Sequence, residues 1–319
     1  MILTPEVLAI FILNIVFGLF GIIAFYLSVK IYLNWDLSST SKTQYRLEKQ
    51  SYLAATIIKF IFIIKVPLFL FFVFTLDKIS NVLTGAMCGA GVVDATDTGT
   101  FLFVLKIINL YIFAYWIALH NEDASREEQP FVKQKFAFFI FAFFLFMAEL
   151  IIEGVMFGSI EIDKMVSCCG TLYSSSSTSA ISSIFALDTS LLLYIFYGIF
   201  FLIVLFYFLK NRYLFAISNA LFVPISLITL IVFFGTYIYE LPSHHCPFCF
   251  LQSDYYFVGY FIYAFLFLGT FYGLVVGFVE SKEEDKLKSY RMSLIFNSLY
   301  VILLTSFVVI YFIKNGVWL

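Results

Sequence analysis

Long apolar stretches recur along the whole chain, separated by short polar connections. A helix needs about 20 apolar residues to cross the roughly 30 Å hydrocarbon core of a membrane. We expect the first stretch to be a span and not a cleavable signal, because no basic region precedes it. The pattern predicts an all-α, polytopic membrane protein, a single bundle over residues 1–319. Its eight transmembrane helices are expected near residues 7–32, 53–76, 100–120, 135–157, 189–209, 214–240, 255–280 and 293–314.

Composition supports this class. The chain is 62% hydrophobic and 13% charged, with a mean hydropathy of +0.98. Soluble domains are about 45–50% apolar and about 25% charged. The formal charge of -2 argues against nucleic acid as a partner, and the chain has no phosphate-binding GxxxxGK[ST] loop. We therefore expect the lipid bilayer as the main partner, with neither nucleic acid nor nucleotide bound.

The distribution of Lys and Arg predicts the orientation. Cytoplasmic loops carry an excess of these residues. The alternate loops near 77–99, 158–188 and 241–254 carry few of them and are predicted to be extracytoplasmic, as are both termini. This predicts a protein of a plasma membrane, such as a bacterial inner membrane. The basic connections contain Lys30, Lys42, Arg46, Lys49, Arg126, Lys133, Lys135, Lys210, Arg212, Lys282, Lys286, Lys288 and Arg291.

All five cysteines fall in the three extracytoplasmic loops. Thiolates, imidazoles and thioethers are the ligands that soft metal ions prefer. We expect one residue from each loop to meet in a single site that faces outward, on the periplasmic side in a bacterium. The candidate metal ligands are Met87, Cys88, Cys168, Cys169, His244, His245, Cys246 and Cys249.

The most specific motif is Cys246-Pro247-Phe248-Cys249. Its spacing suits either a disulfide or two ligands to one metal. We expect it to open the seventh helix, where the partial positive charge of a helix N-terminus favours a thiolate. A protonated His245 would act in the same direction. The placement of this motif resembles the layout of two groups of membrane thiol oxidants, the DsbB type and the vitamin K epoxide reductase type, which are bundles of four or five spans.

Four ionisable residues lie inside predicted spans, where charge is costly and faces a partner or a cavity. Glu149 and Glu153 are four residues apart and share one helix face. Lys65 and Lys106 lie in two other spans. One interpretation is Lys–Glu pairing between helices. The other is a proton path or a polar anchor beneath the cysteine site.

Three functions remain open. In the first, the outer site binds or hands on a soft metal ion, best Cu(I) with Zn(II) possible, in exchange with an extracytoplasmic metallochaperone. In the second, Cys246 and Cys249 are the catalytic pair of a thiol-disulfide oxidoreductase that reacts with a thiol protein and passes electrons to a quinone. In the third, the chain is a permease or accessory subunit with structural cysteines. An odd cysteine count favours the first, because five thiols cannot all pair within one chain.

Overall fold

The computed structural model describes residues 4–36, 39, 41–161 and 188–319. In this part of the chain, eight helices are long and apolar enough to cross a membrane, which confirms the prediction of a polytopic all-α membrane protein. The long helices are α1 (Pro5–Asn34), α2 (Lys42–Ser80), α4 (Gly99–Ala124), α5 (Val132–Ser159), α8 (Thr189–Leu209), α9 (Arg212–Thr229), α11 (Val258–Phe278) and α12 (Glu283–Asn315). The sixth span continues from α9 through η1 (Leu230–Phe234) and α10 (Gly235–Tyr239), and the short elements elsewhere are α3 (Gly89–Asp94), η2 (Cys249–Leu251) and η3 (Ser253–Tyr255).

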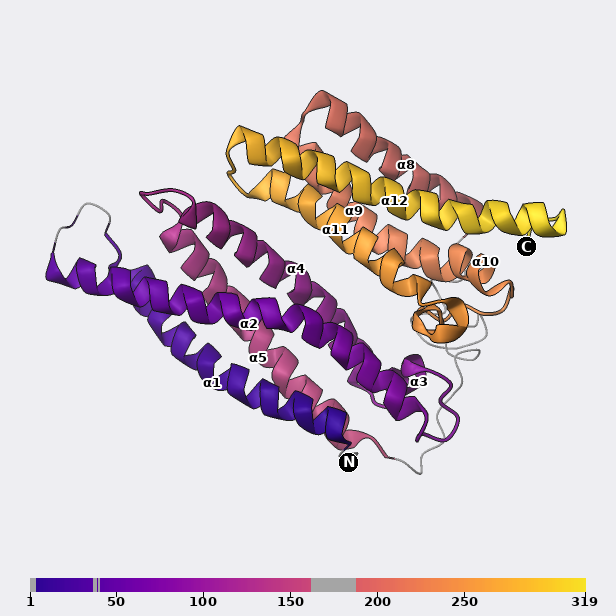
Figure 1. The fold of residues 1–319 in the computed structure, drawn as a ribbon, viewed down its shortest axis with the longest axis horizontal. Coiled ribbons are helices and arrows are strands. Elements are labelled where there is room, and N and C mark those ends of the chain that lie inside the picture. Colours follow the sequence, from indigo (N-terminus) through magenta and orange to yellow (C-terminus); the bar gives the residue numbers. More distant parts are fainter. Residues whose placement is uncertain (1–3, 37–38, 40, 162–187) are drawn as a thin grey trace. The chain divides into compact units, whose positions relative to one another are not determined.

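The chain forms two compact units, whose helices are labelled in Figure 1. The first comprises Met1–Thr84 and Val92–Met165 and contains α1, α2, α4 and α5. The second comprises Gly85–Gly91 and Val166–Leu319 and contains α8 to α12. The short segment with Cys88 is therefore grouped with Cys246 and Cys249, although the first unit surrounds it in sequence.

Local sequence fixes where several spans begin. The Thr4 hydroxyl accepts a hydrogen bond from the Val7 N–H, and Pro5 occupies the first turn of α1. Asp188 and Asn211 cap α8 and α9 in the same way, through side chains that accept from backbone N–H groups. These caps satisfy donors that a helix leaves unpaired at its start.

Aromatic side chains fill the core of the first unit. Phe62 of α2 stacks on Phe113 of α4, with ring centroids 4.2 Å apart, and meets Trp116 edge-on. Phe139 and Phe146 of α5 pack against the same group. Because lipid is as apolar as these rings, helix association here depends on close packing and on polar contacts.

In the second unit, α11 packs closely against α9 and α12. A Cβ atom added at Gly273 would lie 2.2 Å from the Asn219 side chain, and one at Gly277 would lie 2.3 Å from the Ala216 Cβ. Asn219 Oδ1 accepts hydrogen bonds from Asn297 (2.8 Å) and Ser293 (3.2 Å) of α12. The glycine face of α11 thus gives room to a buried polar contact between its two neighbours.

Candidate functional site

Three cysteines that are far apart in sequence meet in the second unit. The sulfur atoms of Cys88, Cys246 and Cys249 all lie within 4.8 Å of one another. Cys88 Sγ and Cys246 Sγ lie 3.4 Å apart. All three residues are buried, with exposed fractions of 0%, 1% and 7%. The cysteines of the loops near 77–99 and 241–254 therefore converge, as expected.

The other predicted ligands do not all join this group. Cys168 and Cys169 lie outside the described residues. Met87 directly precedes the buried Cys88, but its own side chain is 72% exposed. Among the described residues, the three thiols are therefore the predicted ligands whose metal-binding atoms meet.

Turns in the backbone place the thiols. Gly85 has a φ of 92°, a left-handed conformation that glycine adopts readily, and it turns the chain before Cys88. The Cys88 carbonyl accepts a hydrogen bond from the Gly91 N–H at 3.1 Å, at the start of α3. In the third loop, the Phe248 N–H points at Cys246 Sγ from 3.4 Å. Such donors to a sulfur stabilise a thiolate ligand.

The structure corrects the expected position of the CPFC motif. The seventh span, α11, begins at Val258, and the two short elements η2 and η3 separate it from Cys249. Tyr256 and Phe257 have φ values of 53° and 55°, a left-handed conformation that interrupts helical geometry just before α11. The motif therefore lies in the connection before α11, with Cys249 beginning the short η2, and it does not open the seventh span.

Two tyrosine hydroxyls hold the CPFC loop by its backbone. The Tyr239 hydroxyl donates to the Cys246 carbonyl and accepts from the Phe250 N–H at 3.1 Å. The Tyr263 hydroxyl donates to the Pro247 carbonyl at 2.8 Å. Both tyrosines were missed in the sequence analysis. The only signal for them was their position in the two spans that flank the loop. They position the thiols without supplying a ligand atom.

We expect Tyr239→Phe to weaken metal binding at the thiol group by about 10–100-fold, the usual effect of losing a group that orients a ligand. The substitution removes one hydroxyl that serves both ends of the loop, so the three sulfurs lose their fixed spacing. Competition titration of the purified protein with a chelator of known affinity measures the change. Tyr256→Phe is the matched control, because Tyr256 is 90% exposed. Equal affinities in both variants would contradict a positioning role.

The two adjacent histidines have different surroundings. His245 Nδ1 donates to the Ile231 carbonyl at 3.0 Å. In an ordinary α-helix, the Gly235 N–H would donate to this carbonyl. At the π-helical turn η1 it donates to the Leu230 carbonyl instead. The Nε2 atom of His244, by contrast, is buried and has no hydrogen-bond partner among the described residues. Burial also lowers the pKa of His244, so its ring favours the neutral form that can bind a metal.

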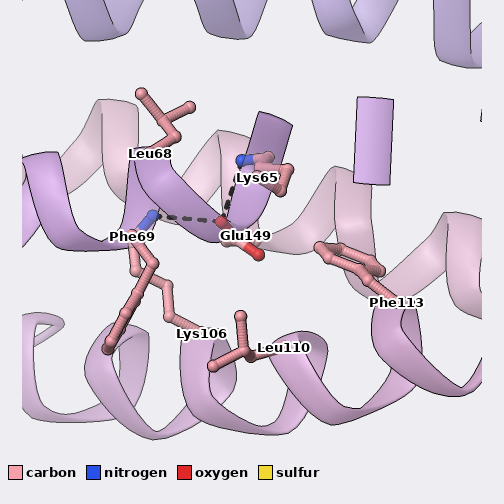
Figure 2. Close-up of a pocket in the computed structure, with 7 residues that line it drawn as sticks. All are labelled: Lys65, Leu68, Phe69, Lys106, Leu110, Phe113 and Glu149. Atoms are coloured by element: carbon pink, nitrogen blue, oxygen red, sulfur yellow. Dashed lines mark hydrogen bonds and ion pairs between the residues drawn. The ribbon is translucent and has the colours of Figure 1, made fainter. Parts of the chain in front are cut away.

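The first unit contains a separate cluster of buried charges. Oε1 of Glu149 lies 2.9 Å from Lys65 Nζ and 3.0 Å from Lys106 Nζ. Figure 2 shows both lysines pointing at Glu149, beside a small pocket lined by these three residues and four apolar ones. Lys106 also pairs with Glu153 at 2.9 Å. All four side chains are at most 5% exposed.

Two asparagines complete this cluster. Asn109 Nδ2 donates to Glu149 Oε2 at 2.6 Å, and Asn14 Nδ2 donates to Glu153 Oε2 at 2.7 Å. Each of the four helices α1, α2, α4 and α5 thus contributes a side chain, and two positive charges face two negative ones. Both asparagines were missed from the sequence, although an amide inside an apolar span is a polar signal that indicates a hydrogen bond between helices.

The fold and the thiol group define the class: an integral membrane protein of eight helices with a buried three-cysteine cluster able to hold a metal ion. Comparison with protein families, with characterised proteins and with solved structures finds no match.

Proposed function

We propose that this protein binds a soft metal ion, Cu(I) best, through Cys88, Cys246 and Cys249. The single observation that carries the proposal is the meeting of three buried sulfurs within 4.8 Å. An ion about 2.3 Å from each sulfur holds the sulfurs roughly 4 Å apart. The sulfur separations, 3.4 Å for Cys88 and Cys246 and at most 4.8 Å within the group, bracket this spacing.

The ligand type supports a soft ion. Three thiolates close together in a buried place repel one another, and a bound cation offsets that repulsion. Thiolate donors select Cu(I) and zinc over the hard ions magnesium and calcium, which prefer oxygen. The group of possible ligands that meets here, among the described residues, contains three cysteines and no carboxylate.

The side of the membrane is part of the proposal. The bias of Lys and Arg toward the alternate loops supports an outward-facing site in a plasma membrane, where a metallochaperone can deliver or collect the ion. Labelling of intact cells with a membrane-impermeant thiol reagent, after reduction and chelation, tests this. Permeabilisation is expected to add no label at Cys88, Cys246 or Cys249. Labelling that requires permeabilisation would reverse the orientation.

Metal analysis tests the function. Protein purified in detergent under reducing conditions and loaded with Cu(I) is expected to retain about one ion per chain, as the three-sulfur geometry implies. The variant with Cys88→Ser, Cys246→Ser and Cys249→Ser is expected to retain none, because hydroxyls are poor ligands for Cu(I). Met87→Leu is the control, since the side chain of Met87 is exposed. Equal copper retention by the wild type and the triple variant would refute the proposal.

A second candidate function rests on the 3.4 Å separation of Cys88 Sγ and Cys246 Sγ. These two thiols can form a disulfide as they pass two electrons and two protons to a quinone, which becomes a quinol. A thiol substrate would then restore the thiols. Metal-free protein that reduces a quinone, and loses this activity in Cys88→Ser, would favour this oxidoreductase function over metal binding.

A further inference from the structure

His244 carries a buried nitrogen that the protein does not satisfy. Its Nε2 has no hydrogen-bond partner among the described residues, although the atom is buried. Buried polar atoms are nearly always paired, and an unpaired one calls for a water, an ion or another explanation. The ring itself is partly exposed, so it lies at the border between the interior and the outside of the loop.

The ring of His244 lies against a residue that also holds the CPFC loop. His244 precedes Cys246 by two residues, and its ring meets Tyr239 edge-on with the centroids 4.3 Å apart. The same tyrosine holds the Cys246 carbonyl.

His245 differs from His244 in having no buried, unpaired ring nitrogen among the described residues. Its Nδ1 donates to the Ile231 carbonyl, which ties the ring to η1 in the sixth span. His244 lies outside the 4.8 Å group of the sulfurs, so it must rotate to join them. Its partial exposure leaves room for that rotation.

We propose that His244 Nε2 is a fourth ligand that determines which metal the site accepts. This inference rests on the proposed function. Three thiolates alone suit Cu(I), and a nitrogen added to them makes the four-coordinate tetrahedral set that Zn(II) prefers. With its ring rotated away the site holds the monovalent ion, and with its ring bound it holds a divalent one.

Cobalt(II) is the probe, because its visible spectrum reports tetrahedral coordination and it occupies zinc sites. Wild-type protein in detergent is titrated with Co(II), then with Zn(II) in competition, and separately with Cu(I). We expect His244→Ala to lose the tetrahedral cobalt spectrum. We also expect it to weaken Co(II) and Zn(II) binding by at least about 10–100-fold, the usual effect of losing a group that only supports a ligand. Its Cu(I) binding is expected to stay unchanged.

Two further variants keep the test decisive. His244→Cys supplies a thiolate at the same position and is expected to restore tetrahedral cobalt with a spectrum shifted by the fourth sulfur. His245→Ala, the neighbouring control, is expected to keep the wild-type cobalt spectrum. The inference is overturned if His244→Ala binds Co(II) as the wild type does, or if it loses Cu(I) and Co(II) in equal proportion. Wild-type protein that binds neither ion would refute the proposed function itself, and a site that binds Cu(I) but no Co(II) would refute the role of His244 alone.

Discussion

Glu149→Gln is expected to destabilise the first unit severely, by about 3–5 kcal/mol, the usual result of breaking a buried ion pair on one side. The amide keeps the shape of the carboxylate but removes its charge. Lys65 and Lys106, which both lie within 3.0 Å of Glu149 Oε1, are then left with one carboxylate between them. Of the two lysines, Glu153 forms an ion pair with Lys106 alone, at 2.9 Å. The charge of Lys65 therefore loses its partner.

A compensating variant separates charge from packing. Lys65→Met added to Glu149→Gln leaves Lys106 paired with Glu153, so the cluster is neutral again. We expect this double variant to recover most of the lost stability, which a double-mutant cycle measures as a coupling between the two positions. Thermal unfolding in detergent provides the values. The readout is the fraction of protein that remains monomeric on size exclusion. If the effects of the two substitutions on the free energy of unfolding are additive, the ion pairs do not stabilise the unit.

The spans and their buried charges were accessible from the sequence because both depend on hydropathy. A lysine or glutamate inside an apolar stretch is conspicuous, and Lys65, Lys106, Glu149 and Glu153 all lie in one network. The pairing of each lysine depends on the rotation of four helices about their axes. A single sequence does not determine that rotation, so the two lysines that share Glu149 Oε1 appeared only in the structure.

The thiol site was predictable in part for a similar reason. The bias of Lys and Arg predicted that the loops with Cys88 and the CPFC motif lie on the same side of the membrane, and their sulfurs do meet. The sequence motif drew attention to Cys246 and Cys249 as a pair, and the structure adds Cys88, whose sulfur lies 3.4 Å from that of Cys246. The left-handed Tyr256 and Phe257, which delay the start of α11, have no sequence signal because neither is a glycine.

The glycines of α11 show the limit of a local pattern. Gly269, Gly273 and Gly277 recur every fourth residue and so form one helix face. The interval indicates close packing of helices in a membrane, but it does not name the partner. The structure places Asn297, Asn219 and Ala216 against the three glycines in turn, and these residues come from α12 and α9.

Gly273→Ala is therefore expected to disrupt the second unit, although it adds a single methyl group. The new Cβ would lie 2.2 Å from the Asn219 side chain, a distance that real Cβ atoms do not show. To avoid it, α11 must move away from α9, or Asn219 must release the 2.8 Å hydrogen bond from Asn297. Overpacking in a close-packed interior typically costs about 1–3 kcal/mol, and the loss of a buried hydrogen bond adds to it.

The matched control is Gly198→Ala in α8, because a Cβ at Gly198 has no atom within 4 Å. Both substitutions favour the helix intrinsically by up to about 1 kcal/mol, so a difference between them reports packing alone. Thermal unfolding in detergent is expected to show a lower midpoint for Gly273→Ala and an equal or higher one for Gly198→Ala. The displaced α11 also carries Tyr263, whose hydroxyl holds the Pro247 carbonyl, so metal affinity at the thiols should fall together with stability. A Gly273→Ala protein as stable as the control would show that the contact between α11 and α9 is looser than the structure has it.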